Sequence, residues 1–268
     1  MSETFYITTP IYYVNGNPHI GHAYTTTAAD AITRYHRLCG RPAYFLTGTD
    51  EHGQKVLEAA EKRGMTPQAH CDDMVVRWKA MMEDLDIGYD RFIRTTDADH
   101  IAVVQGALQR LHDKGELYKD TYTGWYSTAA ERFWTEKDLI DGKCPDTGQP
   151  VVEITETNWF FKMSAYQERL IAHIEANPGF IRPASRKNEI LGFLRKELGD
   201  LCISRPVSRM SWGIPFPFDE DFVTYVWFDA LLNYLTGAGY QPDGTFDGSD
   251  RWPADFQLLG KDILTTHA

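Results

Sequence analysis

The chain has 268 residues, of which 43% are hydrophobic and 13% aromatic, so it can bury one large core or a core plus a smaller inserted module. Its formal charge of −11 at pH 7 argues against a protein that coats nucleic acid through bulk positive charge, although a local basic stripe stays possible. No apolar run approaches the roughly 20 residues that span a bilayer, and the first residues do not form a secretory signal. We therefore expect a globular, cytoplasmic protein without membrane contact.

The four cysteines are scattered along the chain and form no CxxC pair. Their spacing therefore predicts neither a zinc knuckle nor a redox dithiol, and reduced structural thiols are the expected state. These cysteines are Cys39, Cys71, Cys144 and Cys202.

The first predicted unit is a strand, a loop and a helix. Residues 5–8 are β-branched and aromatic, and they run into the turn-rich stretch VNGNP, which ends at Pro18. From His19 onward apolar residues recur at helical spacing until Gly40, which closes the segment. The unit therefore predicts a helix that follows directly on a strand and its loop.

A second unit of the same kind follows. AYFLTG, residues 43–48, is a continuous apolar run typical of a strand buried on both faces of a parallel sheet, and TDEHG opens a helical stretch that reaches Lys62. The repeated order of strand, loop and helix predicts an α/β fold with a doubly wound parallel sheet. Such sheets bind ligands at the carboxyl ends of their strands.

The middle of the chain has a different texture, with more Gly, Pro and Thr, a hairpin-like GKCPDTGQPV, and helical patches at 166–175 and 188–198. The stretches VTYVWFDALLNY and QLLGKDILTTHA that follow are strand-like again, the latter with a Gly turn and a helix start. We therefore expect residues 1–117 to be the first half of the α/β domain. Residues 118–221 would be an inserted module, and residues 222–268 the start of the second half.

The segment PHIGH, residues 18–22, is the first candidate site. Two histidines three positions apart at a helix start share one face, Gly21 lets a phosphate approach the backbone, and the helix N-terminus favours anions. These features suit the phosphates of a nucleotide. Histidines in a lone HxxH are also compatible with a purely structural role. The HExxH pattern of zinc proteases is not present in this segment.

The segment GTDEHG, residues 48–53, is the second candidate. Its acidic pair and His52 follow a buried strand and could hold an ammonium group, a ribose or a metal. The alternative is a helix N-cap made by Asp50, with Glu51 in the first helical turn.

Two further segments are ambiguous alone. YVWFDALLNY, residues 225–234, crowds aromatic side chains that can be either core or the wall of a binding site. GKDI, residues 260–263, places Lys261 and Asp262 after an apolar turn, where they could meet a ribose or a phosphate.

Taken together and in this order, PHIGH, GTDEHG, YVWFDALLNY and GKDI resemble the methionyl-tRNA synthetases, which are class I aminoacyl-tRNA synthetases. The likeness extends through nearly the whole chain and includes ISRPVSRMSWGIP at 203–215. The histidine box alone would indicate only class I, whereas PIYYVNGNP and WFDALLNY point to methionine. The resemblance implies a Rossmann-like fold of the HIGH-type nucleotidyl transferases.

The resemblance also implies a role for each site residue. His19 and His22 would contact ATP and stabilise the charge that develops at its α-phosphate. Asp50 would bind the α-ammonium group of methionine. The side chains expected around the thioether are Ile11, Tyr13, Trp227, Ala230, Tyr234, Ile263 and His267. The residues expected at ATP are Asn15, His19, Gly21 and His22, together with Gly260 and Asp262 at the ribose.

The sequence departs from the family in its second signature, KMSKS, a mobile loop that clamps the ATP phosphates. This motif does not occur in the chain, so we expect a chain truncated before that loop. Adenylate formation should then be severely impaired, while weak methionine binding survives through Asp50, Tyr13 and Trp227. The letters KMS at 162–164 lie inside the inserted module and are interpreted as chance.

A second departure concerns zinc, which many family members hold in the inserted module with four cysteines or three and a histidine. The corresponding positions here are Ser127, Ala130, Cys144 and Thr147. Because one ligand cannot hold a structural zinc, we expect no metal site in the module. The aromatic residues expected to support it instead are Trp125, Tyr126, Phe133 and Trp134.

The resemblance implies a methionine–tRNA ligase. Such an enzyme uses ATP with Mg²⁺ to activate L-methionine as methionyl-adenylate and then transfers it to tRNA(Met). Two alternatives stay open: another class I adenylate-forming enzyme, against which WFDALLNY argues, and a catalytically silent remnant that binds methionine or tRNA.

Overall fold

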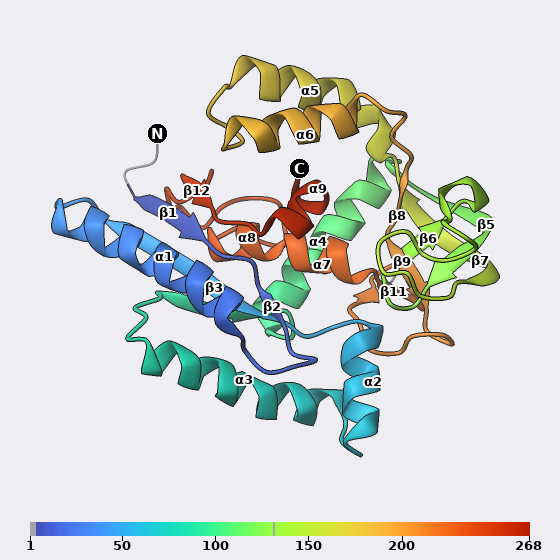
Figure 1. The fold of residues 1–268 in the computed structure, drawn as a ribbon, viewed down its shortest axis with the longest axis horizontal. Helices are drawn as coiled ribbons and strands as arrows, with labels where there is room; N and C mark the ends of the chain where they lie inside the picture. Colours follow the sequence, from blue (N-terminus) through green and yellow to red (C-terminus); the bar gives the residue numbers. More distant parts are fainter. Residues whose placement is uncertain (1–3, 131) are drawn as a thin grey trace.

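The computed structural model describes residues 4–130 and 132–268 (Figure 1). The strands are β1 (Phe5–Thr8), β2 (Tyr12–Tyr13), β3 (Ala43–Asp50), β4 (Arg91–Arg94), β5 (Leu117–Ser127), β6 (Arg132–Trp134), β7 (Val152–Phe161), β8 (Leu201–Cys202), β9 (Ser204–Pro206), β10 (Pro215–Phe216), β11 (Asp219–Thr224) and β12 (Phe256–Gln257). The α-helices are α1 (Ile20–Leu38), α2 (Gln54–Lys62), α3 (Pro67–Asp84), α4 (Ala98–Asp113), α5 (Gln167–Ala176), α6 (Ala184–Leu194), α7 (Val226–Leu231), α8 (Asn233–Gly237) and α9 (Leu264–His267). The 3₁₀ helices are η1 (Glu136–Asp138), η2 (Met163–Tyr166) and η3 (Lys261–Ile263). Among the described helices, none combines the length and apolar character needed to cross a membrane.

A parallel sheet organises the first part of the chain. Strands β1 and β2 both pair with β3, β1 along the first half of β3 and β2 at its last two residues. Strand β4 pairs with residues 46–49 of β3, and β12 lies parallel beside β1. Parallel strands joined through helices form the α/β class that the sequence predicts, so the predicted fold class is confirmed.

Alternate residues of β1 pack on opposite faces of this sheet, as the period of a strand requires. Phe5 and Ile7 are buried with Ala29 of α1, whereas Tyr6 is buried with Tyr234 of α8. The sheet is therefore covered on both faces, which explains why the strand sequences are apolar runs without alternation.

The chain near residue 226 folds differently from the prediction. The stretch VTYVWFDALLNY was expected to be a strand, but β11 ends at Thr224 and the rest forms the short helices α7 and α8. Both helices carry buried residues on several sides, among them Val226, Asp229 and Ala230 of α7. A short helix that is buried nearly all round has no polar face, so its sequence cannot be distinguished from that of a buried strand.

The middle of the chain forms two antiparallel sheets and a helical hairpin. The sheet orders are β6-β5-β7-β8 and β10-β11-β9. Strands β5 to β7 lie at the right of Figure 1, and α5 and α6 lie together at its top. Helix α5 matches its predicted range closely, whereas α6 begins and ends four residues before the predicted 188–198. The division of the chain at residues 117 and 221 stays a prediction.

A substitution of Gly48, in the centre of β3, tests how closely the backbones of β3 and β4 approach each other. A methyl group at Gly48 would collide with the carbonyl oxygen of Ile93, its partner on β4. We expect Gly48→Ala to destabilise the protein by roughly 3 kcal/mol or more, because backbone atoms cannot move aside as a side chain can. Urea unfolding measures this change.

The matched control is Gly192→Ala, at an exposed position inside α6 where the added methyl group meets no atom. Alanine is the better helix former, so this variant should gain about 0.5–1 kcal/mol. Equal loss in both variants would contradict the proposed close approach.

Candidate functional site

The PHIGH segment begins helix α1, and its two histidines cap that helix. The His19 ring Nδ1 accepts the Gly21 N–H at 3.1 Å, and the His22 ring Nδ1 accepts the His19 N–H at 3.2 Å. A ring nitrogen that accepts carries no proton, so the proton of each ring is on Nε2. The two rings are stacked with centroids 3.6 Å apart. The cap therefore provides a fixed pair of Nε2–H donors at a helix N-terminus, which favours anions.

The surroundings of His22 keep it neutral. Its ring lies 4.7 Å from the ring of Tyr12 and 4.7 Å from that of Trp78, and these two rings stack on each other at 5.0 Å. Burial against these rings, together with the neighbouring His19, lowers the pKa of His22 to about 4. At neutral pH His22 thus donates a hydrogen bond without carrying a charge.

Asp50 is the last residue of β3, at the carboxyl end of the parallel sheet. It lies opposite Tyr13 of β2 in the register of the two strands, and its side chain is buried. Helix α2 begins only at Gln54, with Gly53 as its N-cap residue. The alternative in which Asp50 caps a helix is therefore wrong, because pairing with β2 extends β3 through Asp50.

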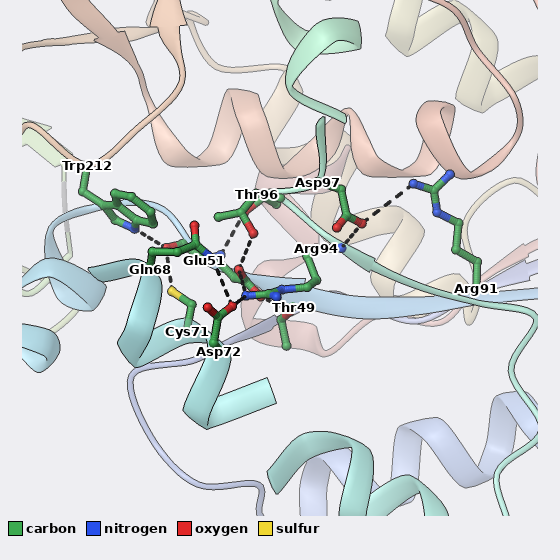
Figure 2. Close-up of polar contacts among 11 residues, drawn as sticks. Thr49, Glu51, Gln68, Cys71, Asp72, Arg91, Arg94, Thr96, Asp97 and Trp212 are labelled. Atoms are coloured by element: carbon green, nitrogen blue, oxygen red, sulfur yellow. Dashed lines mark hydrogen bonds and ion pairs between the residues drawn. The ribbon is translucent and has the colours of Figure 1, made fainter. Parts of the chain in front are cut away.

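The loop after Asp50 is held on one side by a buried ion pair (Figure 2). The Glu51 carboxylate is fully buried, and Arg94 at the end of β4 donates to both of its oxygens, at 2.7 and 2.8 Å. The hydroxyl groups of Thr49 and Thr96 also donate to this carboxylate, each at 2.6 Å. The Trp212 indole donates to the Glu51 carbonyl oxygen at 2.5 Å. Every polar group of Glu51 is thus bound, as a buried charge requires.

The same loop is held on its other side by His52. Its Nδ1 lies 2.6 Å from one carboxylate oxygen of Asp229 in α7, and Nε2 of His100 in α4 lies 2.7 Å from the other. The second ring nitrogen of His100 contacts the hydroxyl of Thr236 at 3.2 Å. All four side chains are buried, so the loop, α4, α7 and α8 meet at one polar cluster.

An aromatic group from α7, α8 and α9 contains several residues predicted around the thioether. The Tyr234 hydroxyl lies 2.9 Å from His267 Nε2, and the Trp227 and His267 rings lie edge to face at 6.0 Å. His267 Nδ1 lies 2.8 Å from the Ile263 carbonyl oxygen, to which it donates, so Nε2 accepts the tyrosine proton. Burial lowers the pKa of His267, which keeps the ring neutral.

The other predicted side chains lie as follows. Ile11 packs in the same hydrophobic cluster as Tyr234, and Ala230 is buried on α7. The predicted ATP residues Asn15, Gly260 and Asp262 are exposed, and their roles stay predictions.

Contacts join the two histidines, Asp50 and the aromatic group into one region. His22 contacts Tyr12, which belongs to β2 and so lies beside Asp50, and His52 connects the Asp50 loop to α7. The residues that sequence reasoning missed are the partners of this loop, Arg94 and His100. They lie in FIRTTDADH, a stretch that carries no pattern of its own, so no sequence signal was available to find them.

The positions that correspond to zinc ligands in the family are Ser127, Ala130, Cys144 and Thr147, and Cys144 is the only cysteine among them. This thiol is buried, which raises its pKa, but hydrogen bonds with Ser127 and Thr147 outweigh burial and the net shift is downward. The Ser127 hydroxyl oxygen also accepts the Ala130 N–H at 3.2 Å. Within residues 4–130 and 132–268 no group of three or more His, Cys, Asp or Glu is arranged to hold a metal. The expectation of a zinc-free module stays a prediction.

The parallel sheet and the histidine-capped helix at its carboxyl edge form an α/β fold of the nucleotide-binding type, and comparison with known proteins identifies the class. A family model described as tRNA synthetases class I (M) matches residues 5–153 and 146–268. Because these two matches cover nearly all of the chain, the chain belongs to this family.

Individual relatives are similar over the full chain. The methionine–tRNA ligase of Clostridium acetobutylicum is 53% identical over 270 residues, which are 100% of this chain and 42% of that protein. That of Streptomyces coelicolor is 49% identical and is covered to 51% of its length. The structure of Mycobacterium tuberculosis methionyl-tRNA synthetase in complex with methionyl-adenylate matches with a TM-score of 0.92 at 46% identity, over 99% of this chain and 52% of that chain. The chain thus spans about half of these relatives or less.

The Glu51–Arg94 pair should dominate the stability of the loop. Glu51→Gln leaves Arg94 without its buried countercharge and turns an amide N–H₂ toward groups that donate, so we expect a loss of about 3–5 kcal/mol. Urea unfolding measures the loss. The control Glu175→Gln, in an exposed pair with Arg195, should cost less than about 1 kcal/mol. Similar losses in both would refute the role assigned to the pair.

The lowered pKa of His22 should appear in the pH dependence of stability. Between pH 4 and 6.5 the unfolded chain binds a proton at this residue that the folded protein does not, so stability falls as pH drops from 6.5 toward 4. Above pH 6.5 the effect is absent. Comparing urea midpoints at pH 7 and pH 5, His22→Gln should show a smaller decrease than the unmodified chain. An unchanged decrease would contradict the assignment.

Proposed function

We propose that this chain supplies the activation site of a methionine–tRNA ligase. The complete enzyme would react L-methionine with ATP and Mg²⁺ to form methionyl-adenylate and pass the methionyl group to tRNA(Met) during protein synthesis in the cytoplasm. Family membership and the similarity to a structure that contains methionyl-adenylate support this proposal. The observation that carries it is the contact-linked arrangement of a histidine pair, a buried carboxylate and an aromatic group at one edge of the sheet.

ATP would lie with its α-phosphate at the start of α1. Nε2–H groups of His19 and His22 are oriented by the cap before any ligand arrives, so they can bind phosphate oxygens without reorganisation. The dipole of α1, whose N-terminus favours anions, adds to this attraction. Because His22 is neutral at pH 7, it would stabilise the developing negative charge through a hydrogen bond.

Methionine would be anchored at two ends. The Asp50 carboxylate would pair with the α-ammonium group in a charge-assisted contact that turns the substrate carboxylate toward the phosphate. Trp227, Tyr234 and His267 would surround the thioether, and sulfur–aromatic contacts are each worth about 0.3–1.5 kcal/mol. Discrimination against a side chain that differs by a methylene would be limited to about 1–3 kcal/mol.

The proposed reaction has two steps. A carboxylate oxygen of methionine attacks the α-phosphorus, the bond to the β-phosphate oxygen breaks, and pyrophosphate leaves with the electron pair. A ribose hydroxyl of the tRNA then attacks the carbonyl carbon, and AMP leaves. The two histidines would act in the first step by stabilising the charge on the α-phosphate oxygens.

Methionine binding tests this proposal. Isothermal titration calorimetry should detect methionine in preference to leucine, and Asp50→Asn should weaken methionine binding roughly 10-fold or more, because a charge-assisted hydrogen bond contributes about 1.5–3 kcal/mol. The control Asp84→Asn, at an exposed position at the end of α3, should bind as the unmodified chain does. Equal affinity in the Asp50 and Asp84 variants would exclude the proposed ammonium site.

ATP–pyrophosphate exchange separates the remaining alternatives. Because adenylate formation is expected to be severely impaired, slow exchange that depends on methionine alone supports the ligase. Exchange with another amino acid or carboxylic acid supports a different class I adenylate-forming enzyme. Methionine binding with no exchange for any substrate supports a binding remnant.

A further inference from the structure

We propose that Asp229 is a positioning residue that fixes the ammonium-binding side of the methionine site relative to its thioether-binding side. This inference rests on the proposed function, since it assumes that Asp50 and Trp227 bind the two ends of one methionine. It adds a residue that would touch no substrate atom, because Asp229 is fully buried.

Asp229 joins three elements through two imidazole rings. One carboxylate oxygen lies 2.6 Å from His52 Nδ1, and the other lies 2.7 Å from His100 Nε2. His52 belongs to the loop after β3, His100 to the first turn of α4, and Asp229 to α7. The sequence separations are 177 and 129 residues, so these contacts hold together parts of the chain that no local structure connects.

His52 and Asp229 lie close along the chain to the two residues proposed to bind the ends of methionine, Asp50 and Trp227. His52 is two residues after Asp50, and Asp229 is two residues after Trp227 and adjacent to Ala230. Helix α7 has only six residues, so a shift of Asp229 moves the whole helix and Trp227 with it. The distance between the two binding ends therefore depends on the contact between His52 and Asp229.

The environment makes this contact rigid. His52, His100 and Asp229 are each at most 4% exposed, so water cannot replace a partner that moves away. Burial by itself raises the pKa of Asp229, but the two histidines outweigh it and the net shift is downward, which keeps the group a carboxylate. A charged acceptor between two N–H donors has short hydrogen bonds and little freedom.

The chemistry of the cluster requires a carboxylate. Each oxygen of Asp229 accepts from a different ring, so both must be acceptors. Asparagine at this position has the same shape but offers one acceptor and one N–H₂ group. One histidine would then face a donor with its own N–H group, and the loop or α7 would have to move.

The second partner allows a test by rescue. The side-chain nitrogen of asparagine can occupy the position of a histidine Nδ1, so His52→Asn keeps a donor toward Asp229, whereas His52→Leu removes it. A purely structural demand for bulk at residue 52 would favour leucine, while the proposed hydrogen bond favours asparagine.

The experiment is calorimetric titration of methionine and of ATP into the unmodified chain and four variants, well below each unfolding midpoint. Asp229→Asn and His52→Leu should each bind methionine roughly 10-fold more weakly, and His52→Asn should stay within about twofold of the unmodified chain. ATP affinity should change less than about twofold in all of them. The fourth variant, Asp30→Asn, removes another buried carboxylate that accepts from Arg34 and the Gly88 N–H. It should lower the unfolding midpoint without changing methionine affinity.

The outcomes separate the two proposals. An unmodified chain that does not bind methionine overturns the proposed function, and the positioning role with it. A chain that binds methionine while Asp229→Asn binds equally well overturns only the positioning role. Equal weakening in Asp30→Asn, or equal weakening of ATP binding, also overturns it, since that shows a general loss of structure. If Asp229→Asn does not fold, the difference between His52→Asn and His52→Leu decides.

Discussion

The loop of three residues that follows β3 is buried, and polar backbone can be buried only where each of its groups finds a partner. The Glu51 N–H donates to the Thr95 hydroxyl, and Trp212 binds the Glu51 carbonyl oxygen and the Gly53 N–H, while two ionic clusters fix the side chains of the loop. Glu51 is bound by Arg94 from β4, and His52 is bound by Asp229 from α7. The loop is thereby fixed from both directions, and Asp50 at its start has a defined place relative to the rest of the sheet edge.

Such clusters contribute more to the uniqueness of the structure than to its net stability. Transferring a carboxylate and a guanidinium from water into the interior costs several kcal/mol for each ion, and their attraction does little more than offset this. An apolar loop of the same shape would be as stable. Apolar contacts have no preferred direction, so such a loop could adopt several conformations. The bidentate contact of Arg94 with Glu51 is made in only one of them. A site that must orient one substrate against another requires this kind of order.

Local patterns predict the fold near the start of the chain well. The strand at 5–8, the helix that follows His19 and the apolar strand from residue 43 could be predicted because their periodicity, turn residues and glycine stop agree. The helices α7 and α8 could not, because complete burial removes the polar face that marks a helix. The candidate site divides in the same way: the motifs contain Asp50 and Trp227, whereas Arg94 and His100 matter only through contacts with residues far away in the chain.

The end of the described chain connects the aromatic group to the helical hairpin. Leu264 and Ala268 pack into the cluster formed by Ile190 and its neighbours on α5 and α6, and His267, in the same turn, is bonded to Tyr234. The hairpin and the thioether wall are therefore mechanically coupled through a single helical turn. A displacement of α5 and α6 that keeps these contacts would move the His267 ring. It would then change the width of the proposed thioether site, although no residue of α5 or α6 belongs to that site.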